Sequence, residues 1–413
     1  MIFTLNCIFI ILFCFWVGYR FRQPFNTAWF TTTLLLKLAA GIVLGLIYRE
    51  LGSGDTLHFY HEGIEIAQRS DNSWLAYFER LTTANYPEYK GEARTEFFTK
   101  LLSPFLILTN NNYWLTAIYL SLINFLCTWF FIRALLKIFP DLKWPALISF
   151  MLVPSVVFWS SGILKDSLAN GMTFLLFAFA ITYDTNRKIR IWEYFLAAIA
   201  LVLVIKLKFY VGALVILGLS LIVLIRIVST FIRGNVAWVM LGMLGVGSLY
   251  LVSLIDYNLH LSHLPLSIYE NNQAILKASD PGQAISFTME PSWISLLINA
   301  PQFLLYGLFG PFPFQGNPYN IIYWLENITL LILIFFNFKL LFIEKVQPRF
   351  HKLFWFAICF VLVLATFLPM SSPNFGTLTR YKAVYLPLLF MFLSYLPIQK
   401  MLKKTFSQSN ISK

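Results

Sequence analysis

Ionisable side chains are rare in this sequence, and the ones that could do chemistry gather in three short segments. Only 12% of the 413 residues are charged and 58% are hydrophobic, so each charge within an apolar stretch needs a structural or chemical reason. The three segments are 52–65, 154–166 and 371–382. We expect the chemistry of the protein to involve the carboxylates and cations of these segments.

The first segment contains Gly-Asp-Thr, and its carboxylate, Asp55, is the predicted catalytic residue. A carboxylate in an external loop can act as a general base toward an acceptor hydroxyl. Asp55 also follows Ser53-Gly54 and begins a predicted helix, so helix capping is the alternative interpretation. A carboxylate that accepts backbone N–H bonds at a cap is a poorer base. The sequence leaves both roles open.

A helical periodicity runs from Asp55 toward residue 69. Polar side chains recur at the spacing of one helical face, and mostly apolar ones occupy the other. The polar face comprises Asp55, His58, Glu62, Glu65 and Arg69, and the opposite face comprises Leu57, Tyr60, His61 and Ile64. We predict an amphipathic helix that lies on the membrane, with His58 and Tyr60 contacting the substrate.

A histidine metal site in this helix is disfavoured. His61 falls on the apolar face, and the His-Glu-x-x-His order of a helical zinc site is missing. A second interfacial helix is predicted over 72–81, where the aromatic residues Trp74, Tyr77 and Phe78 would lie at the level of the lipid headgroups.

The second segment ends in Lys165-Asp166, within a very short external hairpin between two apolar stretches. Ionisable groups at this depth are candidates for function. Asp166 is therefore the second predicted catalytic residue, and Lys165 a predicted substrate contact. The alternative is a local Lys165–Asp166 ion pair, with the lysine reaching toward the headgroups. Asp55 and Asp166 could also share a substrate or a divalent cation, Mg²⁺ or Mn²⁺.

The third segment carries Arg380 and Lys382 on the external side, against the usual bias of basic residues toward the cytoplasm. Both are predicted to bind phosphate, and the guanidinium of Arg380 suits phosphate oxygens best because it binds them with two parallel hydrogen bonds. Anchoring to lipid headgroups is the alternative. Glu326, a carboxylate just inside a predicted span, is a further candidate substrate contact.

The apolar stretches that hold these segments predict an all-α, polytopic transmembrane bundle. The mean hydropathy is +0.70, and repeated runs are long enough to cross about 30 Å of hydrocarbon. Segment 294–312 is interpreted as re-entrant or interfacial. About eleven spans are predicted, at 1–18, 30–48, 112–134, 144–160, 166–183, 191–207, 209–232, 235–256, 321–343, 352–370 and 383–399.

The distribution of basic residues then orients the bundle. Most of them, such as Arg20, Lys137, Lys188, Lys339 and Lys400, fall on one side, which we take as cytoplasmic. The net charge of +12 is therefore a membrane-orientation signal and indicates no nucleic-acid partner. One transmembrane domain over 1–413 is predicted, with a cytoplasmic tail at 400–413. Its external loops would be 50–111, 257–320 and 371–382.

The cysteines add no framework to this bundle. All four, Cys7, Cys14, Cys127 and Cys359, fall within predicted spans, which excludes a disulfide framework and a Cys-x-x-Cys metal site. Together with the short loops, this composition indicates a multi-pass protein of a bacterial inner membrane, with its site facing the periplasm or exterior.

An apolar span, an external Asp55 that opens an amphipathic helix in a large first loop, and spans alternating with short hairpins together resemble the GT-C superfamily of integral-membrane glycosyltransferases. The resemblance extends over roughly residues 30–400. It implies a polyprenyl-phosphate-linked sugar donor and a glycan, lipid or protein acceptor. It also implies inverting transfer, with Asp55 as the first-loop acid, Asp166 as the second acidic position and Arg380 on the donor phosphate.

The sequence departs from the GT-C pattern in two places. A span at 1–18 precedes the one that leads into the first loop, and Asp55 stands alone where an Asp-Glu pair is typical. Two other functions stay open. A polymerase or ligase of lipid-linked polysaccharide repeat units would depend on external Arg and His residues. A lipid-linked glycan flippase or transporter would show internal repeats and charges near the bilayer midplane, where this sequence has only Lys37.

Overall fold

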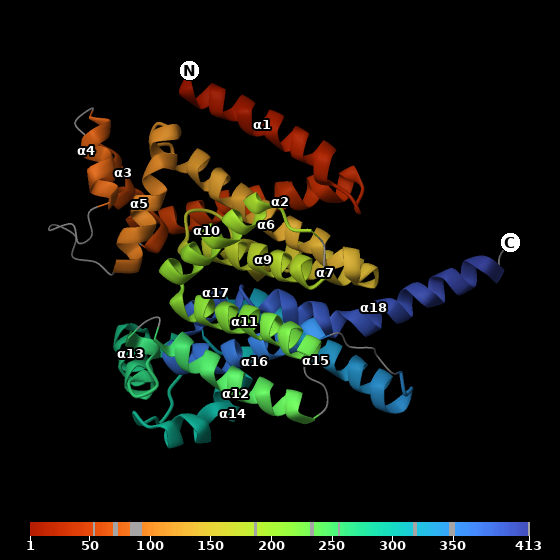
Figure 1. The fold of residues 1–413 in the computed structure, drawn as a ribbon. Helices are drawn as coiled ribbons and strands as arrows, with labels where there is room; N and C mark the ends of the chain where they lie inside the picture. Colours follow the sequence, from red (N-terminus) through yellow and green to blue (C-terminus); the bar gives the residue numbers. More distant parts are fainter. Residues whose placement is uncertain are drawn as a thin grey trace. The chain divides into compact units, whose positions relative to one another are not determined.

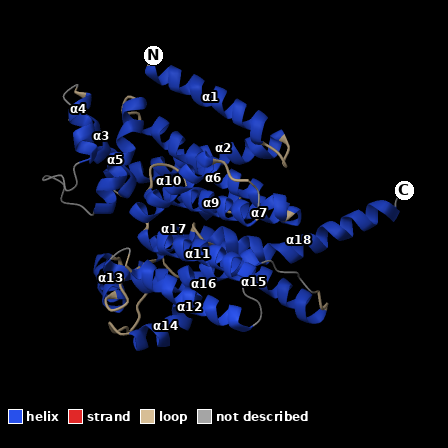
Figure 2. Cartoon of the chain, in the orientation of Figure 1, coloured by secondary structure: helices blue, strands red, loops and turns tan. Residues whose placement is uncertain are grey.

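A computed structural model shows that the chain is built from α-helices, as predicted (Figure 1). Figure 2 marks the helices and the connections between them. The structure describes residues 1–52, 54–68, 73–82, 93–185, 188–231, 235–254, 257–316, 320–346 and 352–411. Within these ranges there is no β-strand, only an isolated bridge between Ala284 and Asn374. Arg69, predicted to extend the polar face of the first-loop helix, lies outside the described residues.

The helices divide the chain into two compact units, and each is described by itself. The first unit comprises residues 1–134, 157–179 and 188–211, and the second comprises 135–156, 180–187 and 212–413. Helices that lie wholly or mainly in the first unit are α1 (Ile2–Phe21), α2 (Thr27–Glu50), α3 (Asp55–Gln68), α4 (Trp74–Thr82), α5 (Ala93–Leu108), α6 (Tyr113–Ile138), α9 (Lys165–Asp184) and α10 (Ile191–Leu207).

The second unit contains the other helices of eight or more residues. These are α7 (Lys143–Met151), α11 (Phe209–Phe231), α12 (Asn235–Ser253), α13 (Leu264–Ala278), α14 (Trp293–Phe309), α15 (Ile321–Phe338), α16 (Lys352–Ser371), α17 (Phe375–Lys382) and α18 (Leu386–Ile411). The short helix α8 (Pro154–Trp159) spans the boundary between the units, and a π-turn at Lys339–Ile343 extends α15.

Side-chain caps fix where several of these helices begin. Asn26 accepts the backbone N–H of Trp29 at 3.0 Å ahead of α2, and Asn374 accepts that of Thr377 at 3.0 Å ahead of α17. Ser292 does the same for α14. Each cap satisfies a backbone donor that has no partner within its own helix.

Among the described residues, six helices are long and apolar enough to cross a membrane, and seven if the bent pair α17–α18 forms one span. The six are α1, α2, α6, α11, α15 and α16. The helical membrane bundle is therefore supported, but the prediction of eleven spans is not. Helix α10, which matches the predicted span 191–207, has 17 residues, and at 1.5 Å per residue it reaches only about 26 Å.

The predicted span at 144–160 shows a second reason for the lower number. The chain forms two short helices there, α7 with nine residues and α8 with six, separated at Leu152 and Val153. Pro154 has no backbone N–H and cannot continue the hydrogen-bond ladder of α7. Hydropathy alone registered the apolar run and missed the break.

The second unit contains a close helix–helix contact between α14 and α16. A methyl group on Gly307 of α14 would overlap the backbone carbonyl of Ala365 on α16. Phe303, Leu364 and Leu368 are buried around this contact. The absence of a side chain at Gly307 therefore sets the distance between the two helices.

We expect Gly307→Ala to destabilise the protein by about 2 kcal/mol, because the added methyl group must push two packed backbones apart. Thermal unfolding of the purified protein in detergent, followed by far-UV circular dichroism, measures the effect. Gly247→Ala in α12 is the matched control, since a methyl group there meets open space and alanine favours helix. Equal unfolding temperatures for the two variants would contradict the packing argument.

Candidate functional site

The first-loop helix α3 packs against α5, an element that the sequence analysis did not predict. Its buried face is formed by Thr56, Phe59, Gly63 and Ala67. The Phe59 ring meets Phe98 of α5 edge-on at 5.1 Å between centroids, and a methyl group on Gly63 would run into Leu106. The amphipathic helix is as predicted, but its buried face is not.

The predicted apolar face consisted of Leu57, Tyr60, His61 and Ile64, and the structure rotates the buried face toward Phe59. His61 is exposed, whereas the other three are half-buried. The reason is that Gly63 lets α5 approach closely on its own side of the helix. The prediction assumed that the apolar face of this helix contacts the membrane, whereas in the structure the buried face packs against α5.

Asp55 is the first residue of α3, and its side chain is exposed. The N–H of His58 donates to the carbonyl of Gly54 at 3.2 Å, which places Gly54 in the cap position and Asp55 in the first turn. Gly54 has a φ of 124°, and a side chain there would collide with the Tyr48 ring. Gly54 therefore sets the direction of the backbone between the end of α2 and Asp55, the first residue of α3.

His58 and Tyr60, the predicted substrate contacts beside Asp55, both have partners within the first unit. The Nε2 atom of His58 lies 3.1 Å from the Glu62 carboxylate. The Tyr60 hydroxyl donates to the carbonyl of Asn111 at 2.6 Å, and burial raises the pKa of this phenol. Tyr60 thus holds α3 against the start of α6, while His58 stays on the exposed face.

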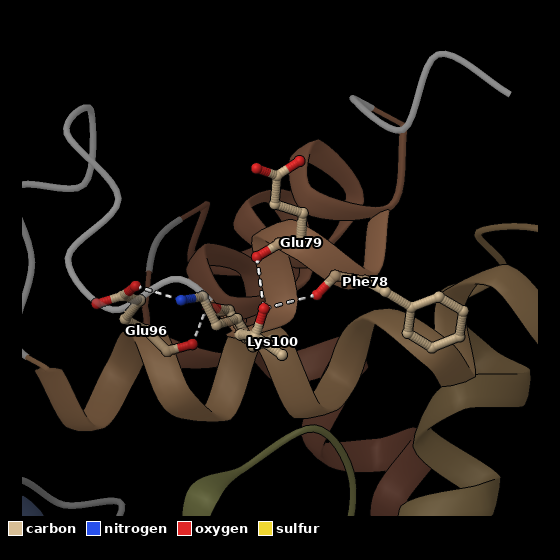
Figure 3. Close-up of polar contacts among 6 residues, drawn as sticks. Phe78, Glu79, Glu96 and Lys100 are labelled. Carbon is tan, nitrogen blue, oxygen red and sulfur yellow. Dashed lines mark hydrogen bonds and ion pairs between the residues drawn. The ribbon is translucent and has the colours of Figure 1, made fainter. Parts of the chain in front are cut away.

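Helix α4 corresponds to the predicted second interfacial helix. Trp74 and Phe78 are exposed, as expected for lipid anchors, but Tyr77 is buried and its hydroxyl lies 2.8 Å from that of Ser103 on α5. Figure 3 shows α5 beneath this helix, with Lys100 paired to Glu96 at 2.6 Å. The exposed rings of Trp74 and Phe78 therefore lie on a helix that a polar contact fastens to α5.

The second segment contacts helices α3 and α5 of the first loop through Lys165. Its ammonium donates to the Thr95 hydroxyl of α5 at 3.0 Å and lies 5.0 Å from the centre of the Phe59 ring of α3. Apolar packing supports the same junction, because Ile163, Leu168 and the end of α10 share one core cluster with Phe59. The structure thus joins the hairpin before α9 to the first loop.

Asp166 is fully buried and forms an ion pair with Lys208, which is itself 5% exposed. Lys165 and Asp166 thus each have a partner on a different element. Lys208 caps the end of α10, where its N–H donates to the carbonyl of Val204 at 2.7 Å. The pair fastens the start of α9 to the end of α10.

Asn170 lies one turn beyond Asp166 on α9, and sequence reasoning did not single it out. It is 1% exposed, and neither polar atom of its amide has a hydrogen-bond partner among the described residues. Buried amides in proteins normally have partners. Asn170 lies four residues after Asp166, on the same face of the helix, and this spacing could have identified it from the sequence.

A further cation, Lys37 of α2, is buried in the same unit and donates to the Ser160 hydroxyl. Gly41 and Gly162 approach each other next to it, and the N–H of Gly162, at a φ of 70°, donates to the Ser121 hydroxyl at 2.9 Å. The basic residue deep in the predicted span thus tethers the hairpin from the side of α2.

The third segment and Glu326 belong to the second unit. The ammonium of Lys382 is buried and donates to the carbonyls of Leu308 and Gly310 at 3.1 and 3.0 Å, and to the amide oxygen of Asn327 at 3.2 Å. An ammonium has three N–H donors, and these three acceptors account for them. Lys382 was predicted as a phosphate contact, and its geometry is that of an internal tether.

Glu326 is buried, and its carboxylate accepts the backbone N–H of Ser155 at 2.7 Å. That donor lies in the first turn of α8, where a negative charge is favoured. Arg380 is half-buried on α17. The two predicted catalytic carboxylates, Asp55 and Asp166, therefore share one unit, and the predicted phosphate ligand Arg380 belongs to the other.

A cation shared by Asp55 and Asp166 has no supporting cluster in the part of the chain that the structure describes. No three His, Cys, Asp or Glu side chains come together there in a way that could hold a metal ion. The chain matches no protein-family model, no curated protein and no solved structure.

We expect Asp166→Asn and Lys208→Met each to destabilise the protein by about 3 kcal/mol, because each leaves its buried partner charged and unpaired. The double variant should cost clearly less than the sum, since it removes both charges. Thermal unfolding in detergent measures the cycle, with Lys277→Met, at an exposed lysine of α13, as the control. Additive losses would show that the pair is not coupled.

Proposed function

We propose that this protein is a membrane glycosyltransferase that moves a sugar from a polyprenyl-phosphate-linked donor to an acceptor hydroxyl at the external membrane face. The observation that carries the proposal is the Lys165 junction. It holds the hairpin with the second acidic position against the helix that begins with Asp55. Helix α3 and the hairpin before α9 are thus joined within one unit, and Asp55 is exposed.

Asp55 has the properties that a general base at a membrane surface needs. Its carboxylate is exposed, it lies outside the cap position, and α3 is held on two sides, by α5 and by the Tyr60 contact to Asn111. A rigid support keeps a reacting group in a productive position. The neighbouring anchors Trp74 and Phe78 would keep this end of the unit close to a lipid-linked donor.

The proposed reaction is a single displacement. The acceptor hydroxyl transfers its proton to Asp55 as its oxygen attacks the anomeric carbon of the donor sugar. The bond between that carbon and the phosphate oxygen breaks, and polyprenyl phosphate leaves with the bonding electron pair. The leaving group is already a stable anion, so the step needs positive charge nearby more than it needs a strong acid.

Different residues would serve the two ends of this reaction. Lys165 lies at the loop junction and would stabilise the leaving phosphate. Asp166 would be a positioning residue that holds the start of α9, because its carboxylate is buried and paired with Lys208. Lys382 and Glu326 have internal partners and are left out of the proposed substrate contacts.

The test compares Asp55→Asn with Glu65→Gln, which alters another exposed carboxylate of the same helix. Purified protein in proteoliposomes is given a panel of radiolabelled polyprenyl-phosphate sugars and crude membrane glycans as acceptors. The release of polyprenyl phosphate is measured. We expect Asp55→Asn to lower transfer at least about 100-fold, the usual contribution of a general base, while Glu65→Gln stays close to the unsubstituted protein.

Thermal unfolding of both variants should match that of the unsubstituted protein, because neither side chain is buried. Transfer that survives Asp55→Asn would remove this residue from the mechanism. No release of polyprenyl phosphate from any donor of the panel by the unsubstituted protein would contradict the transferase itself.

A further inference from the structure

Two histidines in the connection between α12 and α13 form a compact pair that the proposed transferase does not use. His260 and His263 lie on one turn, because the N–H groups of His263 and Leu264 both donate to the carbonyl of His260 at 2.8 Å. Both side chains are half-buried. The centres of the two imidazole rings are 5.8 Å apart.

Each ring is held by a contact at the same nitrogen. The Nδ1 atom of His260 lies 2.7 Å from the Ser262 hydroxyl, and the Nδ1 atom of His263 lies 3.2 Å from the Tyr257 hydroxyl. The Tyr257 and His263 rings also pack together at 4.5 Å between centroids. When Nδ1–H donates to a hydroxyl oxygen, the lone pair of the imidazole is on Nε2.

This arrangement is the one by which proteins orient histidine ligands for metals. A ligating imidazole commonly uses one nitrogen for the ion and the other for a hydrogen bond that fixes the ring. A zinc–nitrogen bond of about 2.1 Å places the ring centre about 3.2 Å from the ion. Two such rings at a tetrahedral angle have centres about 5.2 Å apart, close to the 5.8 Å observed here.

We propose that His260 and His263 form a binding site for a late first-row divalent cation, Zn²⁺, Ni²⁺ or Cu²⁺, through their Nε2 atoms. The two imidazoles supply two ligands, and water fills the remaining positions. Tyr257 and Ser262 are positioning residues that hold the rings in the ligating tautomer. Imidazole nitrogen selects these ions over Mg²⁺ and Ca²⁺, which prefer oxygen.

The first-loop pair His58 and His61 has the same spacing in sequence and provides a built-in comparison. There, Nε2 of His58 lies 3.1 Å from Glu62, and the His61 ring packs against Tyr60 at 5.4 Å between centroids. The ligating atom of His58 is thus already in contact with a carboxylate. The two pairs have the same spacing in sequence, but His58 uses Nε2 for its polar contact, whereas His260 and His263 use Nδ1.

The proposal is tested with the full chain in detergent after removal of any affinity tag. Equilibrium dialysis against Zn²⁺, with metal analysis, gives stoichiometry and affinity. We expect one ion per chain, at least about tenfold weaker binding in His260→Gln and in His263→Gln, and weakened binding in Tyr257→Phe. The double variant His58→Gln/His61→Gln should bind like the unsubstituted protein, and excess Mg²⁺ should not compete.

Three results would overturn the proposal. They are no bound Zn²⁺ in the unsubstituted protein, unchanged Zn²⁺ affinity in the double variant His260→Gln/His263→Gln, or loss of Zn²⁺ binding in the double variant His58→Gln/His61→Gln. Unfolding temperatures measured without metal show whether each variant is folded. Tyr257→Phe and Ser262→Ala, which keep both ligands, provide the test if a histidine variant fails to fold. The dialysis uses neither donor nor acceptor, so its outcome is independent of glycosyl transfer.

Discussion

A carboxylate with no exposed surface must have a cation beside it, and Asp166 obtains one from Lys208 at the far end of a different helix. Either charge alone inside an apolar bundle would cost several kcal/mol, so the start of α9 and the end of α10 cannot separate without a large loss of stability. Consecutive residues of a helix point in different directions. Fixing Asp166 toward α10 therefore leaves Lys165 to reach Thr95 and the Phe59 ring of the first loop.

The first loop takes its shape from that contact. Helix α5 receives Lys165 at Thr95 and the Phe59–Gly63 face of α3 at Phe98 and Leu106, all on one face of α5, so the apolar part of α3 is buried by protein contacts. What stays outside is the opposite face, with Asp55 at its first position. The exposure of the proposed base thus follows from a series of packing contacts. The Asp166–Lys208 pair positions Lys165, Lys165 contacts α5 and Phe59, and α5 covers the apolar face of α3.

Local pattern predicted several of the helices but not their partners. The bounds of α10 agree with the predicted span 191–207, and the apolar runs of α2 and α6 were located to within a few residues. Helix α5 was missed because Arg94, Glu96 and Lys100 made the first loop look solvated, whereas Glu96 and Lys100 pair with each other under α4. Lys208 and Asp166 are distant in sequence, and only the tertiary fold could show that they meet. Asp55 was chosen from sequence as a candidate base, which stays a prediction, and its place in the first turn rather than the cap came from the backbone hydrogen bond to Gly54.

The buried cations show how a membrane protein separates structural charges from chemical ones. Lys37 is bonded to a hydroxyl, Lys208 to a carboxylate, and Lys382 to two carbonyls at the end of α14 and an amide. Each of these contacts pairs a buried charge with a polar group of its own unit. A sequence criterion that treats every ionisable residue near a membrane as a functional candidate will therefore select such tethers along with true sites. Exposure differs among the candidates: Asp55 is exposed and Arg380 half-buried, while Lys382 and Glu326, chosen by the same criterion, are buried.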